Sequence, residues 1–173
     1  MRSSSGAHDA PDAGPVATAE ALARIAGLLD HVDHDGRRVL DAAGRVALVE
    51  SVVAVGRRVE ALRAVLVAEA DRARAAETTR GTSLRTLLSA TAQVTPGEAS
   101  GWVHAGRDLV TREEVRRAAL AGDVSVAQAR AIDGVLGELP ATLDDRQRAR
   151  AEQVMLDKAS RMDARLLARQ TRA

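Results

Sequence analysis

The chain has 173 residues, of which 46% are apolar and 28% charged, a composition typical of a globular domain rather than a disordered chain. It contains no cysteine, which excludes disulfide bonds and thiolate metal sites and removes any argument for secretion. The net charge of +1 is unevenly distributed, with −4 over residues 1–36, +3 over residues 37–80, −1 over residues 81–143 and +3 over residues 144–173.

Trp102 is the only aromatic residue, so alanine, valine and leucine must form the core through close helix contacts. Because such a core is thin for this length, we expect modest stability, helped by self-association. The polar start of the chain, Met1 to Gly6, is unlike a signal peptide. The most apolar stretch, residues 46–55, is interrupted by Glu50 and is too short to span a bilayer. The sequence therefore predicts a soluble, cytoplasmic protein with no membrane partner.

A polar tail precedes the first predicted helix. Residues 1–15 are rich in Ser, Gly, Pro and Asp, a composition typical of disorder. The spacing of apolar residues then predicts a helix from Ala17 to about Asp30, followed by a turn at residues 33–36. The apolar face of this helix consists of Leu22, Ile25, Leu28, Leu29 and Val32.

A long second helix is predicted from about Val39 to Glu77. Apolar residues alternate at spacings of four and three along it, which makes a heptad seam of almost three heptads. The pattern predicts either a dimerising coiled coil or an intramolecular hairpin with the first helix, and the spacing does not decide between them. We assign residues 16–80 to a long helical hairpin whose seam is also the candidate homodimer interface. The seam consists of Leu48, Val52, Val55, Val59, Leu62 and Leu66.

Capping signals divide the second half of the chain into short helices. A Glu or Gln follows three residues after each of Thr95, Thr111 and Ser125. This pattern is typical of a capping box, in which the two side chains bond the free backbone amides at a helix start. No segment alternates like a strand, so we expect an all-α fold, with residues 81–173 forming a bundle of short helices that continues the same domain. The expected helices are 83–92, 96–109, 112–121, 125–138, 143–160 and 163–171.

The histidines do not form a complete metal or catalytic site in the sequence. The stretch from Asp30 to Asp35 combines two histidines with carboxylates, but a structural zinc site needs four ligands, so we interpret it as a solvated, acidic helix end. His104 has neither a nucleophile nor an acid pair beside it, and His8 lies in the tail. The glycines of the 96–109 helix are not placed between a strand and a helix, as a phosphate loop requires. We therefore predict no catalytic, metal, cofactor or small-molecule site.

Two segments of the second half have helix-turn-helix spacing. Residues 84–109 contain a short apolar helix, a turn at Gln93 and a capped helix, and residues 115–139 repeat this outline with Gly122 in the turn. If the second unit entered a major groove, Gln128 could bond adenine while the neighbouring arginines bound phosphates. Two purely structural hairpins are the alternative interpretation. The candidate nucleic-acid contacts are Arg112, Arg116, Arg117, Gln128 and Arg130.

The distribution of charge distinguishes the DNA-binding hypothesis from the protein-interaction hypothesis. Residues 81–143 are net −1, whereas a DNA footprint should be a basic patch. Convergence of the candidate arginines with the basic C-terminal segment on one surface would favour DNA. Internal pairing with Glu113, Glu114 and Asp133 would favour protein interaction, and the i, i+3 spacing of Arg130 and Asp133 makes such pairing feasible.

Several blocks of the second half resemble a known family. The most specific block runs from Gly122-Asp123-Val124-Ser125 to Gln128-Ala129-Arg130 within a helical context. The chain resembles the actinobacterial domain of unknown function 222 family over residues 20–172, and best over residues 82–140. In that family this helical region commonly precedes an HNH nuclease domain, and members include HNH endonucleases and "repeat family" proteins. All matching segments together are residues 82–84, 94–99, 105–109, 120–132 and 139–140, and the specific block lies within 120–132.

The resemblance implies the helical region and not the nuclease. An HNH site needs two His and usually an Asn around one metal, often with Cys pairs nearby, and this chain has no Asn and no Cys. We expect either a stand-alone copy or a truncated nuclease, since the family's nuclease would follow Ala173. The implied function is a non-catalytic module that positions a nuclease partner on DNA. The heptad seam supports the alternative, a protein-interaction or oligomerisation module with no nucleic-acid role.

Overall fold

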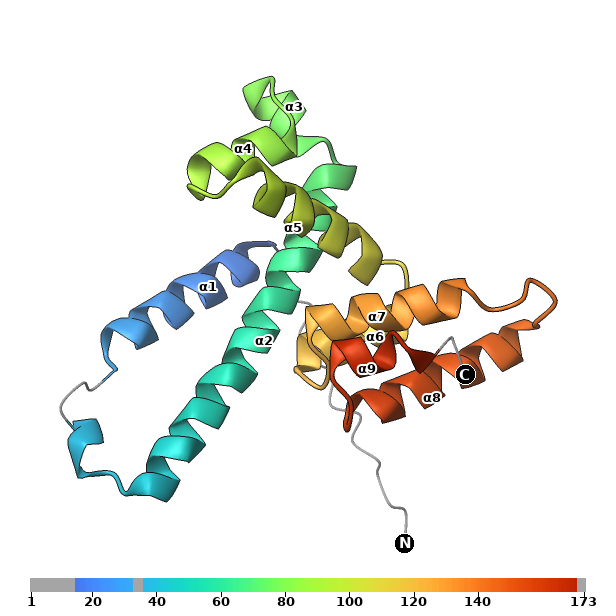
Figure 1. The fold of residues 1–173 in the computed structure, drawn as a ribbon. Helices are drawn as coiled ribbons and strands as arrows, with labels where there is room; N and C mark the ends of the chain where they lie inside the picture. Colours follow the sequence, from blue (N-terminus) through green and yellow to red (C-terminus); the bar gives the residue numbers. More distant parts are fainter. Residues whose placement is uncertain (1–14, 33–35, 171–173) are drawn as a thin grey trace, which may run out of the picture. The chain divides into compact units, whose positions relative to one another are not determined.

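The computed structural model describes residues 15–32 and 36–170, and within them the secondary structure is entirely helical, which confirms the all-α prediction. Most helices begin and end within a few residues of the predicted positions. In chain order the elements are α1 (Pro15–Asp30), the 3-10 helix η1 (Gly36–Val39), α2 (Ala42–Arg72), α3 (Ala75–Arg80), α4 (Leu84–Thr91), α5 (Pro96–Leu109), α6 (Glu113–Ala121), α7 (Val126–Gly137), α8 (Asp145–Ala159) and α9 (Ala164–Leu167) (Figure 1).

The chain divides into two compact units, one ending at Ala47 and one running from Leu48 to Ala173. The first unit contains α1, η1 and the start of α2, where the Asp41 carboxylate accepts a hydrogen bond from the Gly44 amide at 2.7 Å. The apolar face predicted for the first helix, residues 22–32, is exposed in this unit. A hairpin of this helix with the second stays a prediction, and the predicted tail up to residue 14 lies outside the described residues.

The boundary between the units falls inside α2. The C-terminal half of α2 belongs to the short-helix bundle because Ala61, Ala64 and Val65 are part of its core. The helix also ends earlier than predicted. Arg72 is its last residue, and Arg74 adopts a left-handed conformation with φ 49° before α3 begins. No Gly or Pro marks this break, so the apolar pattern did not reveal it.

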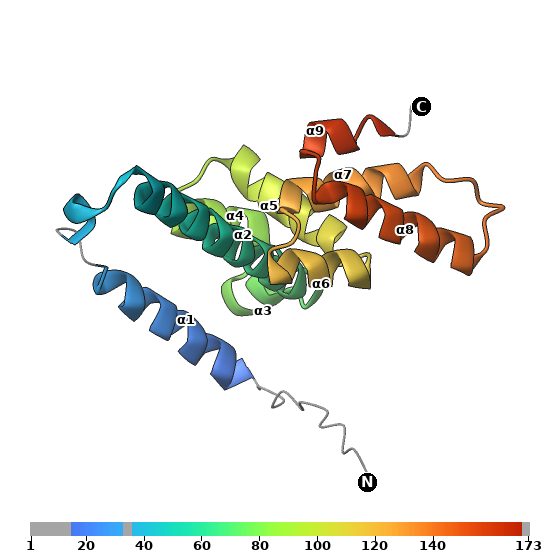
Figure 2. The same cartoon turned by 90° about the horizontal axis from the view of Figure 1, so that it is seen from below.

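The core of the second unit consists of small and branched aliphatic side chains, as the composition predicts. Its main cluster joins α2 to α5, α6, α7, α8 and α9, and a smaller cluster joins Val67, Ala76, Leu84 and Val103. Helix α4 packs along α5, and α7, α8 and α9 pack together (Figure 1, Figure 2). The most deeply buried large side chains are Leu109, Val115, Val124, Ile132 and Leu167.

Close contact between helix backbones makes up for the small side chains of the core. At Gly106 on α5, an added Cβ atom would lie 2.5 Å from the carbonyl oxygen of Ala64 and 3.3 Å from the Cβ atom of Ala68, both on α2. Only glycine allows this crossing, because any side chain would collide with the α2 backbone. Small residues on both helices therefore replace the aromatic packing that this chain lacks.

Two of the three predicted capping boxes are confirmed and one is wrong. Thr95 and Ser125 accept the predicted bonds at the starts of α5 and α7. Bonds from the Thr95 side chain and backbone to the Glu98 carboxylate also lower the pKa of Glu98. Thr111 does not cap α6, because its hydroxyl donates to the Asp108 carbonyl at 2.6 Å, and the helix begins after Arg112 with no side-chain cap.

Candidate functional site

Both helix-turn-helix-like units form as short helices joined by tight turns. In the α4–α5 unit, Gln93 adopts a left-handed conformation with φ 53° at the position where such a turn usually has a glycine. In the α6–α7 unit, Gly122 has φ 91° and its amide donates to the Ala119 carbonyl at 3.0 Å. The turn lies against α2, since a Cβ atom at Gly122 would come within 2.9 Å of Arg58 Cγ. Glycine is therefore required at this turn for both conformation and space.

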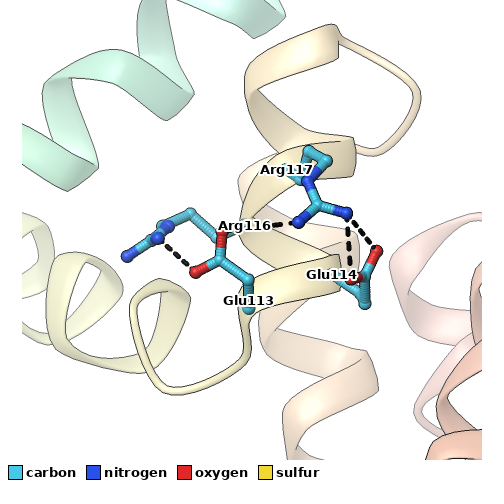
Figure 3. Close-up of polar contacts among 4 residues, drawn as sticks. All are labelled: Glu113, Glu114, Arg116 and Arg117. Carbon is cyan, nitrogen blue, oxygen red and sulfur yellow. Dashed lines mark hydrogen bonds and ion pairs between the residues drawn. The ribbon is translucent and has the colours of Figure 1, made fainter.

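Arg116 and Arg117, two of the predicted phosphate contacts, pair with carboxylates on their own helix (Figure 3). Arg116 Nη2 donates to the Glu113 carboxylate, and Arg117 Nη1 donates to Glu114 Oε2 at 2.8 Å. Arg117 also lies 3.8 Å from Glu113 Oε1. The two acids that open α6 thus neutralise the two arginines one turn later, and the exposed surface of α6 is charge-balanced rather than basic.

The other two candidate arginines, Arg112 and Arg130, form ion pairs between helices. Arg112 Nε lies 2.8 Å from Asp133 Oδ1, which connects the start of α6 to α7. Arg130 Nε lies 2.9 Å from Asp108 Oδ2, which connects α7 to α5. The pairing of Arg130 with Asp133 that the spacing allowed is replaced by these two longer-range pairs.

Gln128, the predicted base-reading residue, is engaged within the fold. Its carbonyl oxygen accepts from the Ser125 amide at 2.8 Å, which completes the capping box of α7. Its amide nitrogen donates to the carbonyl oxygens of Ala159 and Met162, each at 2.8 Å, where α8 turns into α9. These bonds use both amide hydrogens and the acceptor, so the side chain joins α7 to the α8–α9 turn. Each of the five candidate contacts thus has a bonding partner within the fold.

The heptad seam, in contrast, is largely uncovered. Every residue from Arg45 to Glu60 is exposed, and the seam residues in this stretch remain between 42% and 64% exposed: Leu48, Val52, Val55 and Val59. Leu62 and Leu66, which continue the seam, are half-buried.

The seam also faces away from the bundle. Residues two positions apart lie about 200° apart around a helix, so the buried Ala64 and Ala68 are nearly opposite the seam. The same helix thus packs on the bundle with one face and presents its apolar seam on the other.

The described histidines form no metal cluster. Across residues 15–32 and 36–170, no group of three His, Asp or Glu side chains is placed to hold a metal ion. His31 Nδ1 donates to the Gly27 carbonyl at 2.6 Å, and His34 lies outside the described residues. His104 is exposed on α5. In the same part of the chain, no helix combines the length and the apolarity that crossing a membrane requires.

The sequence reasoning missed one stacked pair on α2 and α5. The guanidinium carbon of Arg63 lies 4.2 Å from the centroid of the Trp102 ring, and Arg63 is also 4.0 Å from the Glu60 carboxylate. The only aromatic residue therefore packs against a cation at the edge of the bundle rather than in the core. Nothing in the spacing could have revealed a contact between residues so far apart in the chain.

Comparison with known proteins identifies the family of this chain. A family model described as Domain of unknown function (DUF222) matches residues 46–173, which includes the whole short-helix bundle and nearly all of α2. No curated protein matches the chain, and neither does any solved structure.

Proposed function

The chain belongs to the DUF222 family, and we propose that it acts as a non-catalytic helical module that associates with a second copy of itself through α2. The exposed seam of residues 48–59 carries this proposal. Burial of these exposed valine and leucine side chains against a partner surface would stabilise this half of α2. The internal pairing of the candidate arginines also supports protein interaction over DNA.

The apolar surface is sufficient for a weak dimer. Burying the exposed half of a Val or Leu side chain contributes about 1 kcal/mol, so the seam residues at 48, 52, 55 and 59 contribute about 8 kcal/mol to a symmetric pair. Association costs about 4–15 kcal/mol, so the flanking Val46, Val49 and Val53, also exposed, must contribute as well. We therefore expect a dissociation constant on the order of 1 µM to 1 mM.

Charges placed in the seam should dissociate this dimer. Val55→Asp/Val59→Asp puts two unpaired carboxylates into the interface, and we expect the dimer dissociation constant to rise at least about 100-fold. Analytical ultracentrifugation of the full chain measures this change, and circular dichroism checks that the bundle is still folded.

The single variant Val55→Asp has a matched control in Ala54→Asp, which adds the same charge at the neighbouring position but off the seam. Aspartate replacing alanine loses more helix propensity than aspartate replacing valine, so the control is the harsher change for the helix itself. Retained dimerisation in Ala54→Asp together with loss in Val55→Asp supports the interface. Equal effects of the two substitutions would contradict it.

A second candidate function is an accessory DNA-positioning region of an HNH-endonuclease-like protein. The observation in its favour is the α6–α7 unit, with its left-handed Gly122 turn and its capped second helix. Exposed ion pairs contribute only about 0–1 kcal/mol, so Arg116 and Arg117 can exchange their carboxylates for phosphates at little cost. A nuclease chain is then the second partner.

Salt dependence tests this second candidate. If the arginines at 112, 116, 117 and 130 all contact phosphates, affinity for duplex DNA should fall on the order of 100-fold between 50 and 200 mM salt. Fluorescence anisotropy with a labelled duplex measures how steeply the DNA affinity falls with salt concentration. Arg116→Glu/Arg117→Glu should make this salt dependence less steep. Absence of binding by the full chain at low salt would exclude this role.

A further inference from the structure

An apolar groove separates the C-terminal half of α7 from the N-terminal half of α8. It has a volume of about 510 Å³ and an almost wholly apolar lining that includes Leu136, Leu139, Val154 and Met155. Of the lining residues, Met155 is buried, whereas Val154 remains 36% exposed. The groove is open to solvent rather than enclosed, which suits a side-chain-bearing helix better than an enclosed small molecule.

Among the residues that the structure describes, the charged side chains that line this groove are two arginines. Arg146 and Arg150 lie one helical turn apart on α8, both are exposed, and neither forms an ion pair within the described residues. They differ in this from Arg112, Arg116, Arg117 and Arg130, all of which are paired.

We propose that this groove binds an amphipathic helix of a partner protein that carries acidic residues beside its apolar stripe. Leucine-sized side chains of that helix fill the space between α7 and α8, and its carboxylates pair with Arg146 and Arg150. Nucleic acid does not fit, because an apolar lining offers phosphates and sugars few polar partners. The exposed half of α2 in a second copy does not fit either, since it carries Arg45, Arg57 and Arg58 and is not acidic.

A charge-swap experiment with the full chain tests this proposal. The probes are two labelled helical peptides with the same leucine stripe, one flanked by glutamates and the other by lysines. Fluorescence anisotropy should show the glutamate peptide binding at least about tenfold more tightly. Arg146→Glu/Arg150→Glu should make the lysine peptide the tighter binder. The milder Arg146→Gln/Arg150→Gln should make the affinities for the two peptides similar.

The control is Arg161→Glu/Arg165→Glu, which makes the same charge change at two exposed arginines outside the groove and should leave the preference intact. The proposal is overturned if the glutamate peptide is not preferred, or if the control variant reverses the preference as strongly as the groove variant does. It is also overturned if decanoate binds in an Arg146- and Arg150-dependent manner while neither peptide binds, because the groove then takes a small anion. The seam of α2 is intact in all these variants, so the outcome is independent of the proposed self-association.

Discussion

Gly106→Ala should lower the free energy of unfolding by about 2 kcal/mol. The added methyl group would lie 2.5 Å from the Ala64 carbonyl oxygen, so α2 and α5 must move apart. Overpacking of this kind costs about 3 kcal/mol, and the gain in helix propensity offsets about 1 kcal/mol. Urea unfolding followed by circular dichroism at 222 nm measures the difference.

Gly101→Ala on the same helix is the matched control. A Cβ atom at Gly101 meets nothing within 4 Å, so this substitution should raise the free energy of unfolding by about 1 kcal/mol through helix propensity alone. The two variants should thus differ by about 3 kcal/mol. Equal stability of the two would show that α5 does not cross α2 at Gly106.

Gln128→Ala should lower the free energy of unfolding by about 3 kcal/mol. The substitution removes the capping bond from Ser125 and leaves the carbonyl oxygens of Ala159 and Met162 without their donor. Each lost bond costs about 1 kcal/mol, and the part-buried position keeps water from replacing them fully. Thermal and urea unfolding of the variant measure the loss.

Gln147 provides the comparison for Gln128, because it occupies the same position in the capping box of α8. Its side chain accepts from the Asp144 amide at 3.0 Å, and in the described part of the chain it makes no bond to another helix. Gln147→Ala should therefore cost only about 1 kcal/mol. A loss for Gln128→Ala no larger than this would mean that the bonds to the α8–α9 turn contribute nothing.

Local features were predictable from the sequence because their partners lie within a few residues. The starts of α5 and α7 follow from Thr95 and Ser125, whose bonding partners are three residues away. Thr111 has the same local pattern but was predicted wrongly. Its hydroxyl is also 3.2 Å from Asp133 Oδ1, and a partner 22 residues away is not visible in a capping pattern. The break at Arg74 likewise has no local signal, since the residue is neither glycine nor asparagine.

The candidate site was predictable as a set of residues but not as an arrangement. The spacing identified Arg130 and Asp133 as a possible pair, yet each residue finds its partner on another element. Gln128 was selected for its exposure near a helix start, and only the fold places the α8–α9 turn beside it. The groove at Arg146 and Arg150 depends on the packing of α7 against α8 and has no sequence signature at all.

The heptad seam was the opposite case, because the sequence showed its pattern but not what packs against it. A heptad seam on one helix is compatible with a partner in the same chain or in another, and residues 48–66 alone cannot distinguish them. The bundle shows that Ala61, Ala64 and Ala68 use the other face of α2. This leaves the seam unused within the second unit, and the proposed self-association would give it a partner.

Sedimentation equilibrium of the unaltered chain over a wide concentration range tests the central claim most directly. If α2 pairs with α2 of a second copy, the average mass should rise from 18.2 kDa toward twice that value as the concentration passes from micromolar to millimolar. A mass that remains at 18.2 kDa over this whole range would contradict self-association through the seam.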